Sequence, residues 1–210
     1  MCGINLFGSS VIGFLLLVTH ILGAISVGFL FRFWKSKSNT FKKYNTSKLE
    51  NKLQNVSFSN LGEILVNSIK SATNTVFMVG GFVVLFSVII SILNSSKLIT
   101  IIDLFFTPIC SKLNIPSQLV SSLFTGILEI TNGINLISSI KLKNISINII
   151  LTSFLLGLGG ISVLLQVLSI VSKSDISIKP YILGKILHAI FSAFYTYIMI
   201  KMFPIFNFNL

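Results

Sequence analysis

Long uncharged apolar stretches alternate with short polar segments along the chain. The first stretch runs from Val11 to Phe33 and would extend about 35 Å as a helix at ~1.5 Å per residue. The second is Thr75–Leu93, and two later stretches are Ile145–Ser172 and Pro180–Phe206. Each is close to or above the roughly 20 residues that cross a bilayer as a helix, so each predicts a transmembrane helix.

The chain between the second and third of these spans is less regular. Leu98–Cys110 is apolar, but it would reach only about 20 Å and it carries Asp103 and Pro108. We predict that Leu98–Cys110 and Gln118–Leu128 are the two half-helices of a re-entrant hairpin, because irregular backbone at membrane depth persists only inside a protein bundle. The alternative is one interfacial helix followed by an ordinary span. The predicted fold is an all-α, polytopic transmembrane bundle with about five crossings and a re-entrant or broken-helix element.

Basic residues concentrate between the first and second spans. Residues 35–74 form a basic linker with a surface helix around Ser59–Ala72, for which Asn60 and Glu63 provide a capping-box pattern. Because Lys and Arg are enriched in cytoplasmic loops, this segment is predicted to be cytoplasmic. Residues 1–34, the first transmembrane helix, would then begin outside, and five crossings would place the C-terminus in the cytoplasm.

Composition supports the membrane assignment. Hydrophobic residues make up 53% of the 210 residues, charged residues only 10%, and the mean hydropathy is +0.92, which excludes a water-soluble globule. The lipid bilayer is therefore the expected partner. The net charge of +11 follows from the basic loop, so no nucleic acid is expected. Two cysteines, Cys2 and Cys110, and no Cys/His cluster lead us to expect no cofactor and no metal site.

The strongest candidate for a functional residue is Glu129. It falls in an otherwise apolar run from Ser117 to Ile140, where a carboxylate is costly unless it is paired, wet or protonated. Thr131 and Asn132 offer oxygens beside it, and Gly133 permits unwound backbone, so the group could bind an ion or a polar solute. The alternative is a glutamate that locks helix packing through hydrogen bonds.

The last two spans contain further candidates. Lys185 and His188 lie about one turn apart and are natural partners for Glu129. For Lys185 the alternative is a side chain that snorkels to the interface, and for His188 it is a hydrogen bond to a neighbouring helix. Three glycines in the preceding span invite a break or a tight helix crossing. These structural glycines are Gly157, Gly159 and Gly160.

Catalysis is not expected. Gly160-Ile161-Ser162 together with His188 resembles a membrane serine-protease dyad, but Val163 stands where that motif requires glycine. No segment supplies a recognisable oxyanion hole, and no HExxH motif is present. We therefore expect the protein not to be an enzyme.

Several motifs resemble one known family. LEITNG at 128–133, SFLLGLGGISVLLQV at 153–167, KPYILGKILHAIFSAFYTY at 179–197 and GFLFRFW at 28–34 resemble the C-terminal half of YlbJ-type sporulation integral membrane proteins. These are related to spore maturation membrane proteins and carry a nucleoside-recognition, or gate, domain similar to half of a nucleoside transporter core. The resemblance implies a multi-pass protein of the bacterial inner membrane needed for spore formation, with residues 75–210 as the gate-like transmembrane domain.

The resemblance also predicts how the chain would act. Family members are about twice as long and contain a related first half, so this chain resembles a split or truncated form. Transporters of this kind place the substrate between two inverted repeats, so a lone half would require a second half-transporter chain or a homo-oligomer. The expected role is to move or bind a small polar solute or ion, and the alternative is a non-transporting scaffold for assembly of the spore envelope, its coat or cortex.

Overall fold

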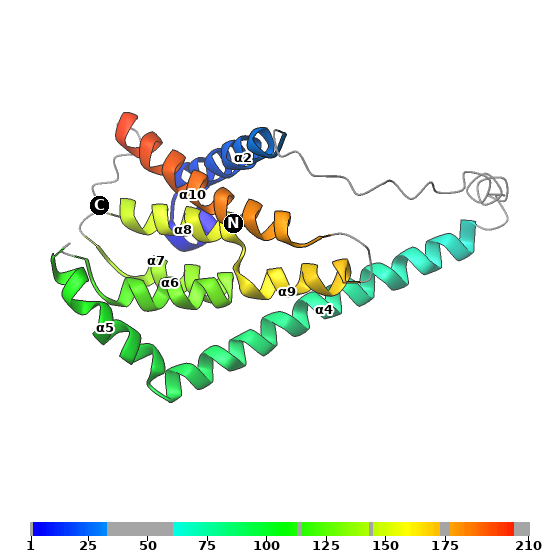
Figure 1. Ribbon diagram of the computed structural model, residues 1–210, viewed down its shortest axis with the longest axis horizontal. Coiled ribbons are helices and arrows are strands. Elements are labelled where there is room, and N and C mark those ends of the chain that lie inside the picture. The colour runs from blue at the N-terminus through cyan, green and yellow to red at the C-terminus, as the bar shows by residue number, and fades with distance from the viewer. Residues whose placement is uncertain (1, 33–60, 113–114, 143–144, 173–176, 204–210) are drawn as a thin grey trace.

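The computed structural model describes residues 2–32, 61–112, 115–142, 145–172 and 177–203. Every regular element in these ranges is an α-helix, which confirms the predicted all-α class (Figure 1). The helices are α1 (Cys2–Phe7), α2 (Ser10–Arg32), α4 (Leu61–Ser95), α5 (Leu98–Lys112), α6 (Gln118–Leu128), α7 (Ile130–Ser139), α8 (Ser146–Leu158), α9 (Gly160–Val171) and α10 (Lys179–Met202).

Four segments of the described chain are long and apolar enough to cross a membrane: α2, α4, α8 with α9 taken together, and α10. The sequence predicted about five crossings. The difference arises between residues 98 and 140, where the chain forms three short helices of 15, 11 and 10 residues. At ~1.5 Å per residue none of them spans the ~30 Å hydrocarbon core.

The first span matches its prediction closely. It was expected at Val11–Phe33 and is found as α2, one residue earlier at each end. A positive φ of 65° at Gly8 turns the chain between α1 and α2, a conformation that glycine adopts without steric cost. The basic linker was predicted at 35–74, and its part up to and including the capping residue Asn60 lies outside the described residues.

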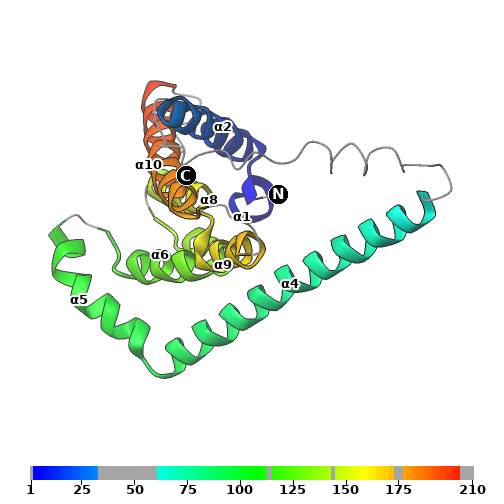
Figure 2. The same cartoon turned by 45° about the vertical axis from the view of Figure 1, so that its right-hand side comes forward.

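The second span differs from its prediction. A surface helix ending near Ala72 and a separate span from Thr75 to Leu93 were expected, but α4 is one continuous helix of 35 residues. At ~1.5 Å per residue it is about 52 Å long, well beyond the thickness of a bilayer. Figures 1 and 2 show that its first half projects away from the other helices. No proline or glycine separates Ala72 from Thr75, so nothing in the sequence interrupts the backbone hydrogen bonds there.

The hairpin prediction was right about the fold-back and wrong about its arms. The expected arms were Leu98–Cys110 and Gln118–Leu128, but α6 pairs with α7, which follows it directly. In the antiparallel pair, Leu119 near the start of α6 shares a buried cluster with Ile137 near the end of α7. Helix α5 instead connects α4 to α6 at the edge of the molecule and leaves Phe105 73% exposed (Figure 1). It thus resembles the interfacial helix of the alternative interpretation.

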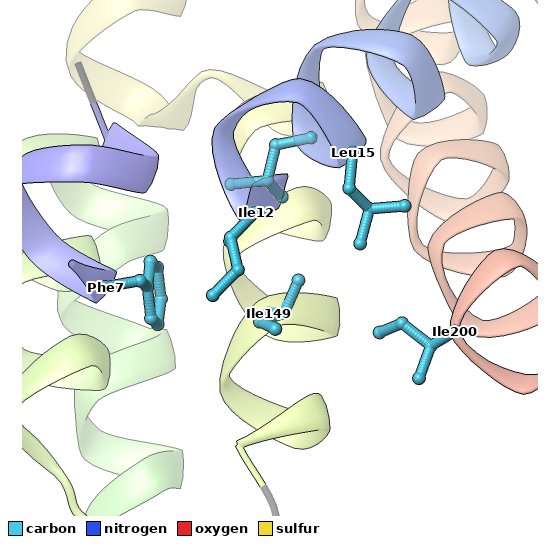
Figure 3. Packing of buried hydrophobic residues seen from close by; sticks show 6 residues of the cluster. Phe7, Ile12, Leu15, Ile149 and Ile200 are labelled. Carbon is cyan, nitrogen blue, oxygen red and sulfur yellow. The ribbon is translucent and has the colours of Figure 1, made fainter. Parts of the chain in front are cut away.

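The centre of the structure is formed by α2, α8 and α10. Figure 3 shows Phe7, Ile12, Leu15, Ile149 and Ile200 converging on one buried cluster from α1, α2, α8 and α10. Beside this apolar cluster lies a group of fully buried hydroxyls. Thr196 Oγ1 is 2.7 Å from Ser153 Oγ and 3.0 Å from Thr19 Oγ1. These hydrogen bonds join three helices without a charge, as is typical of polar contacts between transmembrane helices.

The packing of α2 against α10 corrects the predicted topology. Thr196 contacts Thr19, whereas Gly184, twelve residues earlier on α10, faces Val27, eight residues later on α2. The two helices are therefore antiparallel, and the beginning of α2 lies at the same end of the bundle as the end of α10. Opposite ends were expected from five crossings. The reason for the difference is the hairpin α6–α7, which returns to the end from which it started.

Candidate functional site

The hairpin α6–α7 brings Glu129 into the interior. Its backbone leaves the helical conformation, with φ −142° and ψ 117°, so a single residue separates the two helices. Gly126 and Gly133 make the tight fold-back possible, because a Cβ on Gly133 would overlap the backbone of Gly126. The two helices thus touch backbone to backbone, the close approach that small residues permit between membrane helices.

The Glu129 carboxylate caps the helix that follows it. It is 1% exposed, and its two oxygens accept hydrogen bonds from the backbone N–H groups of Thr131 at 3.0 Å and Asn132 at 2.7 Å. A negative charge at a helix N-terminus also interacts favourably with the helix dipole. The cost of burying this carboxylate is therefore partly offset by α7 itself.

The residues predicted around Glu129 contribute in different ways. The Thr131 side chain is exposed and only its backbone N–H takes part in the cap. Asn132 also reaches α4, since its Nδ2 donates to Ser87 Oγ at 3.1 Å. Gly133 acts through its missing side chain rather than through the unwound backbone that was expected, because it lies within α7.

A second interruption of a helix, between α8 and α9, faces the hairpin tip. Helix α8 ends at Leu158 and α9 begins at Gly160, and both Gly159 and Gly160 have positive φ, of 81° and 77°. A Cβ on Gly160 would meet Gly126 O at 3.3 Å and Ile130 N at 3.4 Å. The predicted break in this glycine-rich segment is thus present, and it packs directly on the turn that contains Glu129.

Helix α10 covers the other side of the break. Lys185 Nζ lies 3.4 Å from the position that a Cβ on Gly159 would occupy. A small, largely apolar cavity of about 170 Å³ lies between Lys185, Gly160 and Ile127 of α6. Gly157, the third of the predicted structural glycines, lets α8 touch the backbone of Ala189, where a Cβ would come within 2.7 Å of the Ala189 Cα.

His188 does not join Glu129. Its Nε2 is 2.9 Å from the backbone carbonyl of His20 on α2, and the centroids of the two imidazole rings are 4.4 Å apart. The expectation that His188 partners Glu129 is therefore wrong, because His188 lies on the side of α10 that faces α2. His20 was missed as its partner, since one histidine in an apolar run carries no signal about which helix it will contact.

Other polar residues of the site were also missed. Asn148 of α8 is buried, and its Nδ2 donates to the carbonyls of Ile137 at 2.8 Å and Ile140 at 2.7 Å, which fixes the end of α7. On α4, Ser87, Ser91 and Asn94 recur at spacings of four and three residues and face the hairpin. That helical spacing is a signal in the sequence that could have found them.

The arrangement places four helix ends at one position inside a membrane-type bundle. Helices α6, α7, α8 and α9 all begin or end within two residues of Glu129 or Gly159. Helix ends carry backbone donors and acceptors that the helix cannot satisfy, so a site of this kind can bind ions or polar solutes where lipid cannot. The fold and the site define a class: polytopic helical membrane proteins with a hairpin whose tip meets a broken helix.

Comparison with known proteins specifies the family. The Gate family, described as nucleoside recognition, matches residues 76–208, which is well over half of the chain. The chain belongs to this family, and the match includes both the hairpin and the broken helix. This agrees with the resemblance found in the sequence.

One curated relative covers nearly the whole chain. The sporulation integral membrane protein YlbJ of Bacillus subtilis (strain 168) is 29% identical over 214 residues, covering 94% of this chain and 51% of the relative. The chain thus spans about half the length of the curated relative that it matches. No solved structure matches this chain.

Proposed function

We propose that this chain is an integral membrane protein of spore formation that forms half of a gate-like or transporter-like unit. In this role it binds or moves a small polar solute or ion where the hairpin tip meets the broken helix. The observation that carries the proposal is the buried Glu129 carboxylate opposite Gly160, a charged group beside two interrupted helices. Sporulation is proposed from the relative of Bacillus subtilis, whose name states that role.

Two features support a binding role for the break. Gly159 precedes α9 and has no side chain that could accept hydrogen bonds from its first turn, so the N–H groups there depend on other partners. Lys185 lies over the same break from α10 and adds a positive charge within reach of a bound group. Interrupted helices that present backbone groups and a few charges are how transporter folds hold polar cargo at membrane depth.

The second half of the unit is proposed to come from another chain. Only 11–28% of the most apolar part of each candidate span is buried within this chain, so most of the surface is left for lipid or protein. A pathway enclosed on all sides requires a facing repeat. We propose a related half-transporter chain or a second copy of this chain as that partner.

The proposed orientation is supported by the charge pattern and the packing together. Helix α2 ends at the side of the bundle opposite to the end of α10. The sequence that follows α2, residues 33–60, contains many of the basic residues. We propose that this segment faces the cytoplasm of a bacterial cell, in accordance with the positive-inside rule. The beginning of α2 and the end of α10 would then both lie outside, which replaces the cytoplasmic C-terminus predicted from five crossings.

The proposed role is not catalytic. Ser162 is 1% exposed and its Oγ has no hydrogen-bond partner among the described residues, while His188 Nε2 bonds to the His20 carbonyl. A serine nucleophile needs a base within hydrogen-bond reach. We therefore expect the unmodified protein, Ser162→Ala and His188→Ala to give the same result, no hydrolysis, when each purified protein is assayed with membrane-protease substrates.

The test of the gate role is Glu129→Gln, with Glu63→Gln as the matched control. Glu63 is an exposed glutamate in the first turn of α4, far from the hairpin. We expect Glu129→Gln to abolish formation of resistant spores at normal membrane levels, and Glu63→Gln to leave it unchanged. Normal sporulation by Glu129→Gln would refute the gate role.

The alternative, a scaffold for spore-envelope assembly, is suggested by the first half of α4, which stands clear of the other helices (Figure 2). Neutralising the lysines of residues 35–52 would block sporulation if that region recruits a partner, while Glu129→Gln would be tolerated. Pull-down of the tagged chain from native membranes separates the two further. A stoichiometric second gate-family chain, or a homo-oligomer, supports the gate role, and an envelope protein supports the scaffold.

A further inference from the structure

A polar groove lies between the last turns of α4 and the hairpin, outside the break described above. Its volume is about 440 Å³. Most of the residues that line it are serine, threonine or asparagine, among them Ser87, Ser91 and Asn94 of α4, Thr125 of α6, and Asn132 and Asn135 of α7. Ile90 of α4 and Leu136 of α7 also line it, so apolar surface lies beside the polar groups. None of the described residues that line the groove carries a charge.

The groove is built into the membrane-spanning part of the chain. Helix α4 is one of the candidate spans, and Thr125 at the floor of the groove is only 1% exposed. Hydroxyl and amide groups that face hydrocarbon lose their hydrogen bonds to water, which is costly. Those lining groups that are not hydrogen-bonded within the chain therefore require water, a polar solute or another protein as a partner.

The two walls of the groove face each other across a gap. They meet at one end, where Asn132 Nδ2 donates to Ser87 Oγ at 3.1 Å. Beyond that contact, Asn135 and Ser91 line the same hollow from opposite helices. A helix interface with another chain would present its polar groups on one outward face, whereas these groups line an open groove from two facing helices. The shape therefore favours a solute over a protein partner.

The groove connects the membrane surface with the candidate site. Its inner end is Asn132, whose backbone N–H donates to the Glu129 carboxylate at 2.7 Å. Its outer end is Ser95, the last residue of α4. From Ser87 to Ser95 the helix rises about 12 Å at ~1.5 Å per residue. The groove thus reaches from the end of α4 to the vicinity of the hairpin tip.

The lining specifies the kind of solute. Hydroxyl groups both donate and accept hydrogen bonds, and the amides of Asn94, Asn132 and Asn135 offer both functions as well. A charged solute would lose its hydration here without meeting a counter-charge. We propose that this groove binds an uncharged solute with several hydroxyl groups and leads it to the hairpin tip. The proposal deepens the proposed function, on which it rests, by naming a substrate class and an entry route.

The groove is tested in the full chain, reconstituted in lipid vesicles, with Cys2→Ser and Cys110→Ala as background. Ser91→Cys is treated with a membrane-impermeant methanethiosulfonate reagent present on both sides. Ile92→Cys, the neighbouring position, which is 61% exposed and does not line the groove, is the matched control. We expect Ser91→Cys to react at least about tenfold faster, because thiols react where water reaches them and Ile92 faces lipid.

The solute class is tested on the same variant. Ribose and ribitol at millimolar concentration are expected to slow the labelling of Ser91→Cys several-fold, and ribose 5-phosphate, which differs by one charged group, is expected not to. Asn135→Leu should remove the protection while leaving the labelling itself fast. The comparison of ribose with ribose 5-phosphate, and of the chain with and without Asn135→Leu, distinguishes a binding site for neutral solutes from a crevice that holds only water.

Three outcomes overturn the proposal. The first is equal labelling of Ser91→Cys and Ile92→Cys, which would mean that lipid or a second chain fills the groove. The second is the absence of protection by either neutral probe, and the third is equal protection by ribose 5-phosphate. Because labelling is read on the purified chain and the gate role on sporulation, failure of the groove proposal can be distinguished from failure of the gate role.

Discussion

At the residue scale, Gly133 controls whether the hairpin can close. Any side chain on Gly133 collides with the backbone of Gly126, and backbone cannot move aside as a flexible side chain can. We expect Gly133→Ala to lower the stability of the folded chain by about 1–3 kcal/mol, the usual cost of overpacking. Thermal unfolding of the purified protein in detergent measures this.

The control for Gly133→Ala is Gly80→Ala. Gly80 also lies in a helix, but nothing within 4 Å would meet its Cβ. Alanine has a higher helix propensity than glycine by up to ~1 kcal/mol, so this variant should be neutral or stabilising. Equal melting temperatures for the two variants would show that the backbones of α6 and α7 are not in contact.

Gly159 is required for a different reason, its left-handed backbone. With φ at 81°, an alanine there is strained by about 1–2 kcal/mol, whereas asparagine tolerates this conformation. We therefore expect Gly159→Asn to melt above Gly159→Ala, although asparagine is the larger residue. The nearest atom to a new Cβ belongs to the flexible Lys185 side chain, which can move aside. The reverse order would mean that space, not backbone conformation, selects glycine at this position.

At the element scale, the continuity of α4 is the feature that the sequence did not reveal. Thr73→Pro would remove a hydrogen bond in the middle of a 35-residue helix and cost about 3 kcal/mol. Gly62→Pro lies in the first turn, where proline is well tolerated. We expect only Thr73→Pro to reduce membrane levels and thermal stability. Equal tolerance of both would indicate two separate segments, as the sequence suggested.

The helices between residues 98 and 140 are a second case in which the predicted and observed elements differ. The bounds of the second predicted arm, Gln118–Leu128, agree with α6, because an apolar run bounded by a proline and a glutamate is visible locally. Its partner was not predictable in the same way. Pairing with α7 depends on the fit between Gly126 and Gly133, which are seven residues apart and meet only after the chain reverses.

At the scale of the whole molecule, the antiparallel contact of α2 with α10 fixes the relation between the two ends. We expect alkaline phosphatase, which requires an oxidising compartment to form its disulfides, to be active when fused after Met202 and inactive when inserted near residue 45. Enzyme activity in a Gram-negative host measures this. An inactive fusion after Met202, with an inactive insertion near residue 45, would restore the five-crossing topology.

The sequence by itself determined that this is an all-α membrane protein, where the spans formed by α2, by α8 with α9 and by α10 lie, and that Glu129 and the Gly157–Gly160 segment are unusual. These features are local: the length of an apolar run, a charge within it, and glycines close together. Tertiary structure decided that Glu129 is buried, that His188 pairs with His20, and that α4 and the hairpin enclose a polar groove. Such contacts join residues up to 168 positions apart, and they depend on which helix faces which, a choice that apolar periodicity does not encode because lipid accepts any apolar face.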